Sequence, residues 1–235
     1  MPIYLLSEDN LLFPPPWLAH DEGMLAIGGD LTPDRLIEAY RNGVFPWFGP
    51  DDPIIWWSPL ERFVIFPTKV KISKSMKQIL RKADYRVSFD EAFAQVLKAC
   101  QQTYPRNEQG TWLTDTLIES LCILHERGVA HSVEVWRGDT LIGGLYGSVF
   151  GKCFYGESMF STQSNGSKIA LIVMSQNLAR QGYELIDCQF RTDHLASMGG
   201  EYITREVFLA HVFANTQIQH TRESWSADFQ GYKPT

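Results

Sequence analysis

The amino-acid sequence predicts an α+β fold, with a small N-terminal domain at residues 1–62 and a larger C-terminal domain at residues 63–235. Alternating apolar runs between residues 131 and 161 indicate three antiparallel strands, because short turns separate them. An amphipathic helix pattern at about 168–181 leads directly into another strand. The charge balance also reverses near residue 62, where an acidic stretch gives way to a basic one. We therefore expect a mostly antiparallel central sheet flanked by helices in the larger domain.

The N-terminal domain is expected to contain one helix and a stiff aromatic loop. Thr32 is a good N-cap, Pro33 suits the first helical position, and Gly43 ends the helical pattern. The loop that follows places three tryptophans among prolines and glycines, at Trp47, Trp56 and Trp57. Proline restricts the backbone of such a loop, so we expect these rings to be held in place. We assign Trp56 and Trp57 to the core.

Strands and helices alternate through the first half of the larger domain. Residues 62–67 and 85–89 have strand patterns, and residues 69–82 predict a strand end followed by a basic helix capped near Ser73. A capping box of Ser88 and Glu91 predicts that a helix opens there and runs to about residue 102. A further helix is expected from Thr114 or Asp115 to Arg127, with Gly128 at its end.

The second half of the larger domain is expected to contain the catalytic residues. Its three strands turn at residues 137–139 and near Gly151, and the helix at 168–181 is followed by a strand over residues 184–190. A short helix near 194–198 and a longer one at 204–214 complete the pattern.

Asp187 and Gln189 stand out in the last of these strands. Residues two apart in a strand share a face, so this acid and this amide are expected to project together. An ordinary hydrogen-bonded pair on an edge strand is the alternative interpretation. The apolar neighbours Leu185 and Ile186 favour a central strand instead, where such a pair needs a chemical reason.

Composition narrows the class of protein. A net charge of −6, 44% hydrophobic residues and the lack of any 18-residue apolar run are typical of a cytoplasmic protein without a membrane span. The N-terminus lacks the basic region of a signal peptide. The four cysteines form no CxxC pair and the histidines show no HxxxH spacing, so we expect buried free thiols, no metal and no cofactor.

The chain resembles the leucyl/phenylalanyl-tRNA–protein transferases over nearly its whole length. The resemblance lies in the blocks GGDLTPDRL, FPWF, DPIIWWSP, GTWLT, HSVEVW, GGLYG, FYGESMFS and LIDCQ. It implies a small N-terminal domain joined to a GNAT-like acyltransferase domain. It also implies transfer of Leu or Phe from aminoacyl-tRNA to proteins with N-terminal Arg or Lys, which creates a degradation signal. The preference among Leu, Phe and Met as the transferred residue stays open. The route by which the attacking amine loses its proton and the identity of the physiological acceptor proteins also stay open.

The resemblance also implies site residues. The catalytic acid, amide and neighbouring carboxylate fall on Asp187, Gln189 and Glu157. Two tryptophans are expected to bind the terminal adenosine of the donor, Trp47 and Trp112. The pocket for the aminoacyl side chain maps onto Leu145, Phe154, Leu171, Met174 and Ile186. Met174 replaces what is often an aromatic residue in this family.

The basic helix suggests a place for the tRNA. Its cations are Lys74, Lys77, Arg81 and Lys82. A solvated helix face is the ordinary interpretation, but a tRNA donor favours contact with phosphates. We expect a monomer.

Two rival functions remain on the sequence alone. The first is an acetyl-CoA-dependent acetyltransferase; such enzymes hold the CoA pyrophosphate on a glycine-rich loop, whereas residues 161–168 contain only Gly166, so no CoA binding is expected. The second is a module that binds tRNA or protein N-termini without catalysis.

Overall fold

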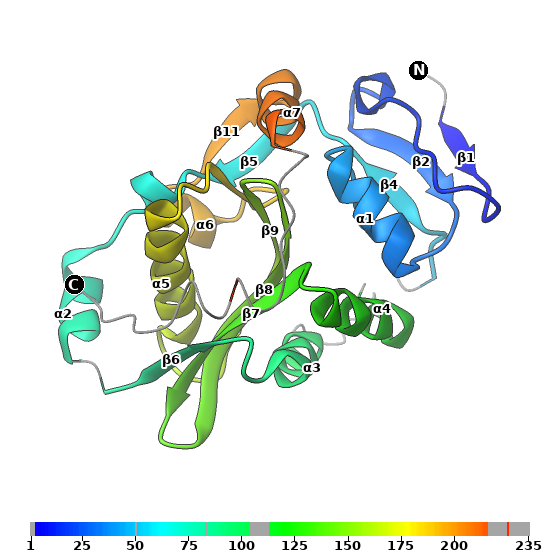
Figure 1. The fold of residues 1–235 in the computed structure, drawn as a ribbon. Coiled ribbons are helices and arrows are strands. Elements are labelled where there is room, and N and C mark those ends of the chain that lie inside the picture. The colour runs from blue at the N-terminus through cyan, green and yellow to red at the C-terminus, as the bar shows by residue number, and fades with distance from the viewer. Residues whose placement is uncertain (1–2, 50, 83, 104–112, 216–224, 226–235) are drawn as a thin grey trace.

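The computed structural model describes residues 3–49, 51–82, 84–103, 113–215 and 225. It contains two β-sheets, one built from the N-terminal part of the chain and one from the rest (Figure 1). Trp112, one of the two tryptophans expected to bind adenosine, lies outside the described residues.

The first sheet has four short strands in the order β1-β2-β4-β3. They are β1 (Tyr4–Leu6), β2 (Met24–Gly28), β3 (Phe45–Pro46) and β4 (Ile55–Trp57). The sequence analysis did not identify these strands, because each has only two to five residues, too few to show a period. Helix α1 (Pro33–Arg41) begins as predicted, with the Thr32 hydroxyl accepting a hydrogen bond from the Arg35 amide. Gly43 follows with a φ of +68°, a conformation that glycine adopts readily.

The second sheet has seven strands in the order β11-β5-β10-β9-β8-β7-β6. In chain order they are β5 (Glu61–Ile65), β6 (Arg86–Phe89), β7 (Ala130–Arg137), β8 (Thr140–Phe150), β9 (Cys153–Ser161), β10 (Leu185–Asp187) and β11 (Glu201–Thr204). Among the described strands of this sheet, β9 and β10 run parallel, and the other neighbouring pairs are antiparallel. The predicted α+β class with a mostly antiparallel central sheet is confirmed.

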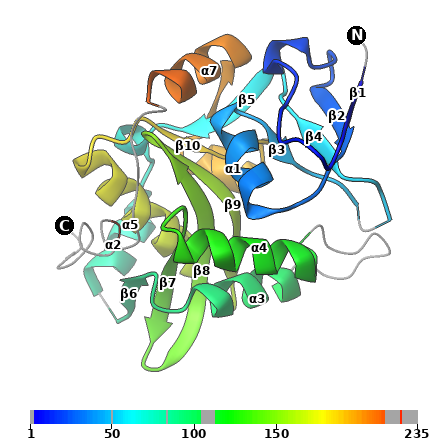
Figure 2. The ribbon, with the colours of Figure 1, turned by 45° about the vertical axis from the view of Figure 1, so that its right-hand side comes forward.

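Helices cover both faces of this sheet (Figure 2). One face carries α3 (Phe93–Thr103) and α4 (Asp115–Glu126), and the other carries α5 (Gly166–Arg180). The remaining helices are α2 (Lys74–Lys82), α6 (Asp193–Ser197) and α7 (Arg205–Ala214), with short 3-10 turns at Pro16–Leu18 and Pro67–Lys69. The apolar sides of α3 and α4 join one core cluster, whereas α5 contributes residues 169–174 and Leu178 to a second cluster on the opposite face.

Several predicted boundaries are wrong. The strand expected at 184–190 ends at Asp187, where the chain leaves the sheet. The strand end expected from residue 69 does not form, because a 3-10 turn at Pro67–Lys69 leads into residues 70–73, which have no regular structure. Ser88 lies inside β6 and its hydroxyl bonds to Glu134, so the helix predicted from the capping box begins later, at Phe93. The central position of β10, between β5 and β9, is confirmed.

The join between the two sheets falls between Trp57 and Glu61, while the domain boundary at residue 62 stays a prediction. Within the described ranges, none of the helices is both long enough and apolar enough to cross a membrane.

Candidate functional site

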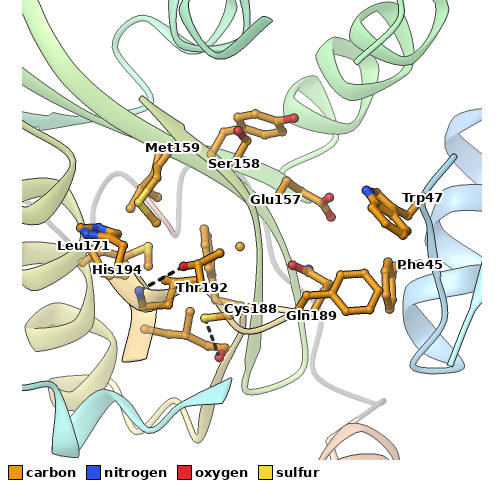
Figure 3. A pocket seen from close by; sticks show the side chains of 18 of the residues that line it. Phe45, Trp47, Glu157, Ser158, Met159, Leu171, Cys188, Gln189, Thr192 and His194 are labelled. Carbon is orange, nitrogen blue, oxygen red and sulfur yellow. Dashed lines mark hydrogen bonds between the residues drawn. The ribbon is translucent and has the colours of Figure 1, made fainter. Parts of the chain in front are cut away.

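A cavity of about 550 Å³ lies at the meeting of β8, β9, β10, α5 and the loop that follows β3. Figure 3 shows Glu157 and Gln189 at the end of the cavity that faces Phe45 and Trp47, with Leu171 and His194 further away. Residues of both sheets therefore line the cavity.

The apolar wall of the cavity contains all the residues predicted for the aminoacyl pocket: Leu145, Phe154, Leu171, Met174 and Ile186. Three neighbouring strands and one helix bring them together. The register pairs Ile186 of β10 with Phe154 of β9, and Leu145 of β8 lies opposite Met159, which also lines the cavity. Helix α5 closes this wall with Leu171 and Met174, one helical turn apart.

Glu157 provides the carboxylate of the cavity. It lies on β9, and its Oε1 atom accepts a hydrogen bond of 2.5 Å from the Tyr40 hydroxyl of α1. Burial raises the pKa of Glu157 to about 7; the Tyr40 hydrogen bond acts in the opposite direction, and the negative charge of Asp187 raises the pKa further. This group can therefore take up or release a proton near neutral pH.

Gln189 lies just beyond the end of β10 and contributes the amide. Its backbone is left-handed, with a φ of +54°, and its N–H donates to Asp187 Oδ1 at 2.9 Å. When the side-chain amide is oriented to satisfy its neighbours, Nε2 donates to the carbonyl oxygens of Gly156 at 3.0 Å and Cys188 at 3.1 Å. These two bonds fix the plane of the amide at the edge of the cavity.

Asp187 does not line the cavity. Its side chain is 0% exposed, and Arg62 donates to both carboxylate oxygens, from Nε to Oδ1 at 2.8 Å and from Nη2 to Oδ2 at 2.7 Å. The prediction that Asp187 and Gln189 project together from one strand face is wrong, because the strand ends at Asp187 and the chain turns at Gln189.

Arg62 is itself completely enclosed. Its Nη1 donates to the Gly43 carbonyl at 3.2 Å, and its guanidinium lies between the rings of Phe45 and Phe208, 4.4 and 4.3 Å from their centroids. Burial works against the charge, but the facing Asp187 carboxylate outweighs it and raises the pKa of Arg62. The sequence analysis did not identify this residue, because a lone arginine at the start of a strand carries no local signal.

Two exposed aromatic rings lie at the mouth of the cavity. Trp47 is 49% exposed, Phe190 is 38% exposed, and their ring centroids are 5.0 Å apart. The indole of Trp57 donates to the Trp47 carbonyl at 2.7 Å, which holds the loop. Trp56 is buried in the core, as predicted, whereas Trp57 is only partly buried and packs against that core. Phe190 was missed, because a regular strand would have pointed it away from Gln189.

The basic helix α2 presents its cations to solvent. Lys74, Lys77, Arg81 and Lys82 are all exposed. Met76 and Leu80 bury the opposite side of the helix. Within the part of the chain that the structure describes, none of these four cations forms an ion pair.

One further cluster has the residue types of a metal site, namely Asp90, His125 and His131. His131 Nδ1 lies 2.7 Å from Asp90 Oδ2 and its Nε2 lies 3.1 Å from the Gly128 carbonyl oxygen. His125 Nδ1 lies 2.8 Å from the Ala130 carbonyl oxygen. These nitrogens are already used in hydrogen bonds, so the cluster is a satisfied polar part of the core.

Comparison with known proteins assigns the family. The leucyl/phenylalanyl-tRNA protein transferase family matches residues 64–213, and its N-terminal domain matches residues 29–60. A leucyl/phenylalanyl-tRNA–protein transferase from Desulforapulum autotrophicum is 48% identical over 96% of this chain and 98% of that protein. Another from Syntrophus aciditrophicus is 50% identical over 96% of this chain and 94% of that protein. The chain belongs to the leucyl/phenylalanyl-tRNA protein transferase family.

Proposed function

We propose that this chain is an aminoacyltransferase that moves Leu or Phe from aminoacyl-tRNA to the α-amino group of proteins with N-terminal Arg or Lys. The product would carry a new N-terminal residue that marks it for degradation. The observation that carries the proposal is the apolar cavity whose one end holds both a carboxylate, Glu157, and a fixed amide, Gln189. The family relationship supports the same reaction.

The reaction needs alignment more than activation. An aminoacyl ester is already a reactive acyl donor, and holding it against the incoming amine contributes about 7–11 kcal/mol in favourable cases. The cavity wall built from Leu145, Phe154 and Met174 would take the apolar side chain of Leu or Phe. Trp47 at the mouth would stack on the terminal adenine, an interaction worth about 1–3 kcal/mol.

Glu157 is placed to receive the acceptor. Its carboxylate attracts the α-ammonium group through a charge-assisted hydrogen bond. The nucleophile must then lose a proton, and an α-amino group has a pKa of about 7.7–8.0. A carboxyl group with a pKa of about 7 is well matched to take that proton near neutral pH. Glu157 is therefore our candidate for the general base.

Gln189 would align the attacking nitrogen. Because its Nε2 is committed to the Gly156 and Cys188 carbonyls, Oε1 is the atom available to accept a hydrogen bond from the amine. Asp187 would support Gln189 through the backbone N–H of that residue and would not contact the amine, since Arg62 already donates to both carboxylate oxygens of Asp187. In this scheme Asp187 supports the site but does not take the proton.

Helix α2 would contact the phosphates of the tRNA. Its exposed cations act on the backbone whatever the base sequence, which suits an enzyme that accepts several tRNAs. Replacing Lys74, Lys77, Arg81 and Lys82 with Glu should weaken donor binding and flatten its dependence on salt. An unchanged salt slope would remove α2 from the scheme.

Acetyl-CoA is a poor match for the loop before α5. A Cβ atom built on Gly166 would lie 2.5 Å from the Ile142 carbonyl oxygen, and one built on Gly143 would lie 2.5 Å from the Gly166 backbone. The glycine thus serves a close contact between the loop and β8. We expect calorimetry to detect no acetyl-CoA binding at micromolar concentrations.

The deciding experiment is one incubation with radiolabelled leucyl-tRNA and a peptide that begins with Arg. We expect labelled peptide from Arg- and Lys-starting sequences, and none from the same Arg peptide with an acetylated N-terminus. Binding of both substrates without labelled product would instead support the non-catalytic module.

A further inference from the structure

We propose that Arg62 is a positioning residue of the site: through Asp187 it fixes the left-handed turn that holds Gln189 and Phe190 at the cavity. The test by activity rests on the proposed function, whereas the test by hydrogen exchange does not. Three sets of contacts link Arg62 to the cavity.

The first link is the geometry of the ion pair. Arg62 and Asp187 are 1% and 0% exposed, and two parallel hydrogen bonds fix the carboxylate plane relative to the guanidinium. The guanidinium is held in turn by the Gly43 carbonyl and by the rings of Phe45 and Phe208. The Asp187 carboxylate therefore has little freedom to rotate.

The second link joins the carboxylate to the turn. Asp187 Oδ1, the oxygen that accepts from Arg62 Nε, also accepts from the backbone N–H of Gln189. Gln189 has a φ of +54°, which is uncommon for a residue with a side chain and needs support from its surroundings. This hydrogen bond supplies such support, and the turn directs the Gln189 amide and the Phe190 ring to the cavity.

The third link joins the two sides of the cavity. Phe45, which packs against the guanidinium, also lines the cavity and lies 5.6 Å from the Phe190 ring. Gly43, whose carbonyl accepts from Arg62, belongs to the N-terminal part of the chain. Arg62 thus holds the N-terminal aromatic wall and the Gln189 turn in one arrangement.

A second buried arginine provides a matched control. Arg35 is 0% exposed and donates from Nε and Nη2 to Asp30 Oδ2, at 3.2 and 2.9 Å. Neither Arg35 nor Asp30 lines the cavity. Arg35→Lys and Arg62→Lys each keep the charge and lose the planar fork, so they separate a general loss of packing from a loss at the site.

The first experiment measures hydrogen exchange of the Gln189 backbone amide by NMR, which requires no activity. In Arg62→Lys we expect this exchange to accelerate by at least about tenfold relative to neighbouring β10 amides, because the carboxylate is no longer fixed. In Arg35→Lys we expect no such local change. Equal exchange of Gln189 in Arg62→Lys and wild type would overturn the proposal.

The second experiment is a double-mutant cycle on kcat with Arg62→Lys, Gln189→Ala and the pair. Alone, Arg62→Lys should lower kcat by at least about tenfold, and after Gln189→Ala it should cost less than about threefold, because it acts through that amide. If the losses in kcat of the two single variants multiply in the double variant, Arg62 has a general structural role and the proposal is overturned. Should Arg62→Lys not fold, Asp187→Asn takes its place in both experiments, with the same expectations.

Discussion

Two carboxylates on neighbouring strands differ in their hydrogen-bond partners, and this difference determines which of them can bind substrate or exchange a proton. Glu157 of β9 meets the Tyr40 hydroxyl and lines the cavity, whereas Asp187 of β10 meets the Arg62 fork and is sealed from solvent. A guanidinium neutralises the charge and uses both oxygens; a hydroxyl leaves the charge and the second oxygen in place. This difference supports the proposal that Glu157 transfers the proton and binds the ammonium group, while Asp187 supports the site.

The largest expected effect tests the first half of this comparison. Glu157→Gln keeps the size of the side chain but removes its charge and its basicity. If Glu157 is the general base, the rate of transfer should fall by about 10²–10⁴ in single-turnover measurements. Activity within about threefold of wild type would exclude that role.

The same variant has a stability signature. A folded-state pKa raised from 4.5 to about 7 means that the folded protein binds the proton more tightly than the unfolded chain. Protonation of Glu157 therefore contributes to stability fully below pH 4.5, and this contribution is lost as the pH rises through about 7. Wild type should lose melting temperature relative to Glu157→Gln between pH 5 and 8, and a constant difference would argue against the raised pKa.

Asp187→Ala tests the other half, and should cost stability as well as rate. Leaving the Arg62 charge buried without its partner is expected to destabilise the fold by about 3–5 kcal/mol, measured by denaturant unfolding. Transfer by the folded fraction should fall at least about tenfold, as it should in Gln189→Ala. Gln189→Ala, however, should retain nearly wild-type stability. If Asp187→Ala were as stable as Gln189→Ala, the proposed division of roles would be wrong.

Tyr40→Phe sharpens the comparison by changing only the partner of Glu157. The Tyr40 hydrogen bond lowers the pKa of Glu157, so its removal should raise that pKa. The acidic limb of kcat/KM against pH reports the free enzyme and should move to higher pH. A limb that stays in place would mean that Glu157 does not control it.

The smallest effect concerns the ring that the Gln189 turn presents. Phe190→Ala should raise KM for the donor by about three- to tenfold, near the lower end of a base-stacking contribution, with kcat little changed. Trp17→Ala is a suitable control, because that tryptophan is 57% exposed and does not line the cavity. Equal KM values in both variants would remove Phe190 from the donor site.

Local signals predicted much of the fold. Thr32 and Thr114 cap their helices as expected, and the alternating pattern located β7, β8 and β9, because caps and alternation depend on neighbours in the chain. The N-terminal strands were missed. Their two to five residues are too few to show a period.

The candidate site was only partly predictable. The apolar pocket residues came from the family resemblance, and the cavity contains all of them. The predicted orientation of the Asp187 side chain was wrong, because that orientation depends on Arg62, which lies 125 positions away in the chain. No pattern within residues 184–190 reports that contact, so the end of the strand and the left-handed turn at Gln189 could not be read from the sequence.

The central claim is that the cavity holds the aminoacyl side chain, and donor discrimination tests it most directly. The measurement is the ratio of kcat/KM for phenylalanyl-tRNA to that for leucyl-tRNA, in wild type and in Met174→Ala. This ratio does not depend on the folded fraction. Because each methylene in an apolar pocket is worth about 1–3 kcal/mol, the wider pocket should raise the ratio by at least about fivefold. An unchanged ratio would contradict the account.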